Sequence, residues 1–464
     1  MGNLIYKTKN RLRAFFTNKD LTKKAIFTLL MLAIYILGTT ITLPFVKIKN
    51  EDAISSNSFL NTLNLIGGGG LRQFSLFALG ISPFINASLI MMILQSKIFP
   101  PIYKLSQSGP QGRRKINIIT RLLTIVISYP QAVFLIKTLG NGNSQFIELD
   151  GYGIVSKEFL TFFMLPMVLT SASLFALFIS EQITNKGIGN GTSLIIFTGI
   201  AARLPFQFKE AFLHYIGVDL SGSSGVLVGI VNFFTYILVY LLVLMIIAIV
   251  YVAERHIPIQ QIGAGRSKSK KDIGYLPIKL NPAGIMPIIF AMMVLSFPTM
   301  IANILPDDNA SKQWINQNMQ FTQPIGFTLL IVIIFAFSLV MGIQQSKVDK
   351  IAEDFAKNST FIPGVRPGEE TQDYLIGIVF RLSVFSSFYL LALGSMQFIE
   401  IMAGILPNVI SFGGTGLMIL VSVALETVGQ LQARIKSNNL SKAKRESIKN
   451  IESNSAENVE GLLW

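Results

Sequence analysis

The stretch VLVGIVNFFTYILVYLLVLMIIAIVYVA, residues 226–253, contains no charged side chain over 28 consecutive positions. The hydrocarbon core of a bilayer is about 30 Å thick and an α-helix rises about 1.5 Å per residue, so about 20 apolar residues can cross it. This stretch therefore predicts a membrane-spanning helix.

Nine further charge-poor stretches of similar character predict nine more spans. They cover residues 25–46, 74–96, 122–136, 159–180, 187–202, 280–305, 324–345, 374–393 and 412–433. An even number of spans places both ends of the chain on the same side of the membrane. Overall, 51% of the residues are hydrophobic and 14% are charged, against about 25% charged in a soluble domain. We therefore expect a polytopic, all-α membrane protein.

The positions of Lys and Arg indicate which side of the membrane each connection faces. Of the 39 in the chain, 30 fall in the two tails and in the connections 97–121, 181–186, 253–279 and 346–372. The opposite connections hold eight, and Arg381 lies within the ninth span. Cytoplasmic loops carry the excess of Lys and Arg, so both tails are predicted to be cytoplasmic. The net charge of +14 is then mainly a consequence of topology.

Several kinds of catalytic chemistry are disfavoured by the composition. The chain has no Cys, and its two His residues, His214 and His256, are far apart in sequence, so we expect no metal site. No GxxxxGK[ST] loop is present, and the spans contain very few ionisable groups. We therefore expect neither enzymatic activity nor a cofactor.

Six short motifs occur in order along the chain. They are FALGISPFINAS (77–88), GRRK (112–115), EQITNKGIGNGTS (181–193), LNPAGIMP (280–287), FIPGVRPGE (361–369) and FGGT (412–415). Together they resemble the SecY family, whose members form the channel of the bacterial Sec protein translocase. The resemblance covers about residues 20–436.

The resemblance implies a fold of two halves, each with five spans, related by an inverted pseudo-symmetry. The first half would be 25–202 and the second 226–433, joined by an extracytoplasmic connection at 203–225. Residues 1–24 and 434–464 would be cytoplasmic tails.

The resemblance also implies a pore closed at mid-membrane by a ring of mostly aliphatic side chains. The matching residues are Ile81, Ile85, Thr192, Ile196, Met286 and Ile419. A narrow apolar constriction holds back ions by dewetting, yet offers no fixed partner to a sliding polypeptide.

Two moving parts are implied as well. Residues 61–74, with Gly67, Gly68, Gly69 and Gly70, match the plug that fills the outer funnel of an idle channel. A lateral gate between spans two and three and spans seven and eight would release transmembrane segments into lipid. Three polar residues, Asn86, Gln131 and Asn281, are expected to hydrogen-bond across it.

The family's partners follow from the same resemblance. SecE and SecG would complete the channel, and the ATPase SecA or the ribosome would dock on the cytoplasmic loops 253–279 and 346–372. Signal peptides and nascent polypeptides would pass through, in the bacterial inner membrane. The expected docking residues are Arg255, Arg266, Lys268, Lys270, Lys271 and Arg366.

Other hypotheses stay open at this point. An accessory SecY paralogue that exports glycosylated adhesins would share the fold. A secondary transporter for a small solute would also be helical and built of repeats, but it predicts charged groups near the midplane, which are nearly absent. A membrane-embedded enzyme would need a catalytic dyad that the sequence does not offer.

Overall fold

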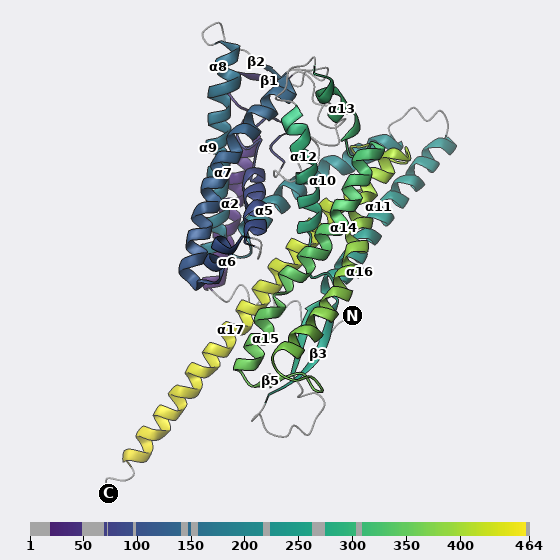
Figure 1. Cartoon of the computed structure of the whole chain (residues 1–464). Helices are drawn as coiled ribbons and strands as arrows, with labels where there is room; N and C mark the ends of the chain where they lie inside the picture. Colours follow the sequence, from purple (N-terminus) through teal and green to yellow (C-terminus); the bar gives the residue numbers. More distant parts are fainter. Residues whose placement is uncertain are drawn as a thin grey trace.

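The computed structural model describes residues 19–48, 69–71, 73–95, 99–140, 147–149, 156–216, 223–261, 274–302 and 309–460. Helices dominate it, and they form an amino-terminal and a carboxy-terminal group (Figure 1). The amino-terminal group comprises α2 (Lys19–Thr40), α5 (Ser82–Leu94), α6 (Pro100–Gln107), α7 (Gly109–Gly140), α8 (Lys157–Phe159), the π-helix η1 (Leu160–Met164), α9 (Leu165–Lys186) and α10 (Gly191–Ile216). The carboxy-terminal group comprises α11 (Ser223–Val252), α12 (Met286–Ala302), α13 (Ala310–Asn318), α14 (Pro324–Ser346), α15 (Val348–Lys357), α16 (Glu369–Met402) and α17 (Gly414–Glu460).

Each of the ten predicted spans contains a helix, but only seven helical stretches of the described residues are long and apolar enough to cross a membrane. The spans predicted at 74–96 and 280–305 hold the short helices α5 and α12, which begin at Ser82 and Met286. Pro83 and Pro287 follow directly, and proline favours the first turn of a helix. The residues before each start are turns, so the predicted spans began too early.

Helix α10 also differs from the prediction. It continues to Ile216, well into the segment 203–225 that was expected to be a connection, and its second part carries Arg203, Lys209 and Glu210. The predicted tail is helical too, because α17 continues from the tenth span as far as Glu460 (yellow in Figure 1).

Two small sheets depart from the all-α expectation. Strands β1 (Val46–Ile48) and β2 (Ile147–Leu149) pair antiparallel. Strands β3 (Glu254–Gln261) and β4 (Gly274–Lys279) form a hairpin within the predicted loop 253–279, and β5 (Thr360–Phe361) pairs with the end of β3. Figure 1 shows α15, β3 and β5 at one end of the molecule and α8, β1 and β2 at the other.

The surface of the helix assembly suits lipid. Helices α2 and α11 expose long rows of apolar side chains, among them Leu29 (67%), Leu37 (64%), Leu227 (64%) and Phe234 (65%). Large contiguous apolar surfaces are unfavourable in water, so they mark contact with a membrane or a partner. With seven apolar helices of spanning length, the chain is a multi-pass membrane protein.

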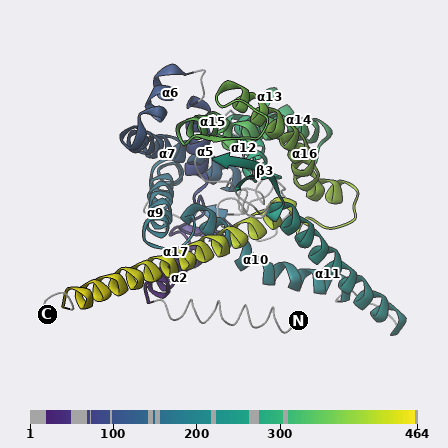
Figure 2. The ribbon, with the colours of Figure 1, turned by 90° about the horizontal axis from the view of Figure 1, so that it is seen from below.

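The two groups meet along two lines. On one side, α10 packs against α11 and α17. On the other, α5 contacts α12, and these two lie side by side when the molecule is seen from below (Figure 2).

Within the carboxy-terminal group, α14 and α16 make the most extensive helix pair, and small residues line their interface. These are Ser338, Gly342, Ser383, Ser387 and Gly394. Small residues allow close approach of membrane helices.

Candidate functional site

Four of the six predicted ring residues share one buried cluster. Ile81 immediately precedes α5, Ile85 lies in its first turn, Ile196 comes from α10 and Ile419 from α17. All four are at most 6% exposed. Three segments that are remote in sequence therefore place isoleucines in one apolar core between the helix groups.

The other two predicted ring residues lie differently. The Thr192 hydroxyl is 2.9 Å from that of Ser180, and Thr192 lines the cavity described below. Met286 is 38% exposed at the first position of α12 and is not a member of the cluster, whereas Ile288 and Ile289 of the same helix are. A turn ends at Ile285, and α12 starts at Met286, directly before Pro287. Met286 is therefore the first residue of the helix.

The end of the predicted plug lies against α10. Gly67 and Gly68, like most of 61–74, fall outside the described residues. Gly69 has a φ of +90°, a conformation that L side chains rarely adopt, and a Cβ at this position would lie 3.4 Å from the Gly199 carbonyl oxygen. At Gly70 a Cβ would lie only 2.4 Å from the Phe77 carbonyl oxygen. Both glycines are thus required by their local geometry.

The three predicted gate residues are buried, but their hydrogen bonds do not cross the seam. Asn86 donates to Gln131 at 3.5 Å, and Gln131 donates to Ser82 at 2.9 Å, all within the amino-terminal group. Asn281 instead accepts from the Gly284 amide at 3.0 Å and from the Ser386 hydroxyl at 2.6 Å. The expected bonding of Asn281 across the gate is therefore wrong for this conformation, because its side chain closes its own turn and binds α16.

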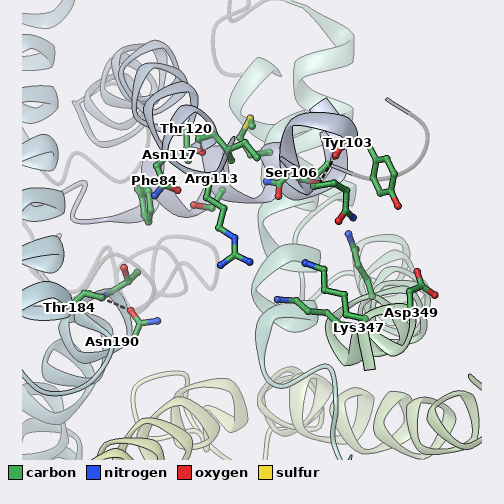
Figure 3. A pocket seen from close by; sticks show the side chains of 18 of the residues that line it. Phe84, Tyr103, Ser106, Arg113, Asn117, Thr120, Thr184, Asn190, Lys347 and Asp349 are labelled. Atoms are coloured by element: carbon green, nitrogen blue, oxygen red, sulfur yellow. Dashed lines mark hydrogen bonds between the residues drawn. The ribbon is translucent and has the colours of Figure 1, made fainter. Parts of the chain in front are cut away.

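A large open cavity of about 1420 Å³ lies next to this seam. Its walls come from α5, α6, α7, α9 and the start of α10 on one side, and from α14, α15 and α16 on the other. Figure 3 shows Arg113, Asn117 and Thr120 of α7 facing the same space as Lys347. The lining is mixed, with several hydroxyl and amide groups, and Thr192 is the one predicted ring residue among the described residues that line it.

Two of the predicted docking residues can be located. Arg255 is exposed on strand β3. The Arg366 side chain is 88% exposed, and its only ion pair among the described residues is a loose 3.8 Å contact with Glu370. Arg266, Lys268, Lys270 and Lys271 lie outside the described residues.

Some features were not predicted from the sequence. Glu400, near the end of α16, is buried and accepts a hydrogen bond of 2.8 Å from the Phe412 amide just before α17. Arg434 of α17 donates to the Gly187 carbonyl at 2.9 Å and so joins α17 to the turn between α9 and α10. No group of acidic or His side chains suited to a metal occurs among the residues that the structure describes.

The arrangement is similar to that of known channels. Residues 75–428 match the family model described as SecY. The chain is 36% identical over 465 residues to the protein translocase subunit SecY of Mycoplasma capricolum, covering 99% of this chain and 96% of that protein. It is 35% identical over 429 residues to the protein translocase subunit SecY of Bacillus subtilis, covering 92% and 97%.

Solved structures show the same fold. One, described as the structure of a protein conducting channel, aligns with a TM-score of 0.61 and 17% identity over 89% of this chain and 92% of that one. Sec61 in the canine ribosome-channel complex from the endoplasmic reticulum aligns with a TM-score of 0.58 and 16% identity over the same shares. With a family model that spans most of its length and relatives of this identity, the chain belongs to the SecY family.

Proposed function

We propose that this chain is the pore subunit of a Sec translocase, which passes unfolded polypeptides across the membrane and releases transmembrane segments into lipid. The observation that carries the proposal is that Ile81, Ile85, Ile196 and Ile419, which come from three remote segments, all belong to one buried apolar cluster shared by the two helix groups. Isoleucine side chains cannot replace the hydration shell of an ion, so such a constriction opposes ion flow without selecting a peptide sequence.

The proposed path runs from the large cavity through this constriction. The cavity is wide and mixed in polarity, as a passage for varied side chains needs to be, while the four isoleucines belong to a buried apolar cluster. Thr192 lines the cavity, and Gly69 of the predicted plug segment lies next to Gly199 of α10. Met286, which is 38% exposed at the start of α12, stays a predicted member of the ring.

The lateral gate is proposed at the contact of α5 with α12. The Asn86–Gln131 bond lies within the amino-terminal group and the Asn281–Ser386 bond within the carboxy-terminal group, so neither has to break when the groups part. The Asn86 side-chain oxygen is buried at this seam without a hydrogen-bond partner among the described residues. A signal core of about ten Leu gains roughly 3–6 kcal/mol by entering lipid, and one central Lys removes about half of this. Partition at the seam would thus separate membrane spans from secreted chain.

The remaining expectations complete the proposal. The ten helices would form two inverted halves of five, in the bacterial inner membrane, with both termini cytoplasmic. SecE and SecG would cover exposed helix faces, and SecA or the ribosome would dock on the hairpin of β3 and β4 and on the loop that carries Arg366. The chain holds no nucleotide-binding loop, so the driving force has to come from a partner.

Depletion in the source bacterium tests the function. We expect uncleaved secretory precursors to accumulate when the protein is withdrawn, and a plasmid-borne copy to restore processing. An Arg366→Glu copy should fold normally, because this exposed side chain makes only one loose contact, but it should restore processing poorly. Glu370→Gln removes the same contact and serves as the matched control. Normal maturation of precursors in the depleted cells would refute the assignment.

A further inference from the structure

The carboxylates that line the large cavity are all engaged. Glu181, Asp349 and Glu353 each bind a neighbouring side chain at 2.6–2.7 Å. Their partners are Arg121 for Glu181, Gln372 for Asp349 and Lys357 for Glu353. The charges of Glu181 and Glu353 are therefore balanced by a basic partner, whereas Asp349, bound to a neutral amide, keeps its negative charge.

Three basic side chains that line the same cavity have no such hydrogen-bonded or ion-paired partner among the described residues. Arg113 comes from α7, Lys347 from the junction of α14 and α15, and Lys350 from α15. All three are exposed, and none forms an ion pair or a side-chain hydrogen bond within the described part of the chain. Figure 3 shows Arg113 and Lys347 reaching into the cavity from opposite walls. Three such cations against one unbalanced carboxylate, Asp349, leave the cavity with a net positive charge.

The backbone at Lys347 is a second, independent observation. Its φ and ψ of 45° and 44° are left-handed, and it is both the C-cap of α14 and the N-cap of α15. Glycine is the usual residue at such a junction, because a Cβ is strained there. Strain that persists where a smaller residue would relieve it points to a task for the side chain.

We propose that Arg113, Lys347 and Lys350 form an anion-binding collar at the entrance of the channel, which binds acidic segments of the entering polypeptide and slows basic ones. This rests on the proposed function, since it assigns the charge preference of that same passage. A cavity with low-dielectric walls concentrates the field of such charges, and salt weakens it. Arg113 and Lys347 stand on opposite walls, so a chain between them meets charge from both sides.

Binding of unfolded peptides to the purified, membrane-reconstituted protein tests the collar directly. Two fluorescent peptides of one sequence, differing only in four Asp or four Lys, are titrated at low and at high salt. With three exposed contacts of ordinary strength, we expect the acidic peptide to bind on the order of tenfold more tightly at low salt. The difference should shrink at high salt and vanish in the variant Arg113→Gln, Lys347→Gln, Lys350→Gln. A preference that is absent in the wild type, or unchanged in this variant, overturns the proposal.

A matched control removes the same charge elsewhere. Lys19, Lys23 and Lys24 are exposed near the start of α2, outside the cavity, so their replacement by Gln should leave the peptide preference intact. Loss of the preference in this control as well would show that only the net charge matters, and it would equally overturn the collar.

Single substitutions of Lys347 distinguish a role in peptide binding from a role in the stability of the fold. Lys347→Gly should raise the melting temperature and weaken acidic peptide binding about twofold to threefold, whereas Lys347→Arg should keep the binding. A structural role predicts that Gly would preserve or improve binding, and that result would remove Lys347 from the collar.

Import into vesicles distinguishes this inference from the proposed function. If neither a basic nor an acidic secretory substrate is imported, the proposed function fails. If both are imported at equal rates by the wild type and the triple variant, only the collar fails.

Discussion

Replacing Gly342 by Ala probes the close contact of α14 with α16. A Cβ at this position would lie 2.2 Å from the Ser383 hydroxyl oxygen and 2.9 Å from the Ser383 Cβ, well inside van der Waals contact. Rotation of the hydroxyl can relieve the first clash but not the second, so the helices have to separate. Overpacking of this kind costs about 1–3 kcal/mol, which exceeds the roughly 1 kcal/mol that Ala gains over Gly in a helix.

We therefore expect Gly342→Ala to destabilise the protein by up to about 2 kcal/mol, measured by circular dichroism during thermal unfolding in detergent. Gly377→Ala on α16 is the matched control, because nothing lies within 4 Å of its Cβ, and it should be neutral or slightly stabilising. Ser383→Gly in the Gly342→Ala background should restore most of the stability that Gly342→Ala loses. The packing argument is refuted if Gly342→Ala behaves like the control, or if the double variant shows no coupling.

Three further substitutions test single contacts. Lys347→Gly should stabilise the protein by about 0.5–1 kcal/mol in thermal melts, because it relieves a left-handed backbone, and an unchanged or lower melting point would contradict this. Glu400→Leu should cost about 1–3 kcal/mol, because the buried Phe412 amide loses its acceptor, while Glu400→Gln should recover part of this; equal stability of the two variants would argue against the hydrogen bond. Arg434→Gln should speed hydrogen exchange at the Gly187 turn, and protection equal to wild type would speak against this contact.

The positions of the helices could be predicted from the sequence because lipid imposes a simple rule. An uninterrupted apolar run such as 226–253 has few alternatives to a spanning helix, and the structure has a helix in each predicted run. Helix starts were less accurate. Pro83 and Pro287 mark the first turns of α5 and α12, and reading them as helix starts would have shortened both spans correctly.

The β-hairpin was missed although the sequence carries its signal. Ile257 and Ile259 on β3, and Leu276 and Ile278 on β4, alternate with exposed residues at the period of two that indicates a strand. The segment 253–279 is rich in charge and was predicted only as a connection, although this alternation indicates strands.

The site residues depend on tertiary contacts that no local pattern contains. Four isoleucines of the ring could be proposed only through the resemblance to a family, because periodicity does not distinguish a pore lining from ordinary packing. A family resemblance does not predict the hydrogen bonds of Asn281, because its bonds to Gly284 and Ser386 depend on local backbone geometry. The left-handed Lys347 has no sequence signal at all, because neither Gly nor Asn occupies that position.

The most direct test of the account measures ion leakage and polypeptide import in the same vesicles. With its partner subunits and an ATP-driven motor, the wild-type protein should import a secretory substrate while idle vesicles stay tight to ions. Ile196→Asn, which places an amide in the buried isoleucine cluster, should keep import but let ions leak from idle vesicles. Vesicles that never import the substrate, or an Ile196→Asn variant as tight as the wild type, would contradict the claim that this cluster is the seal of a polypeptide channel.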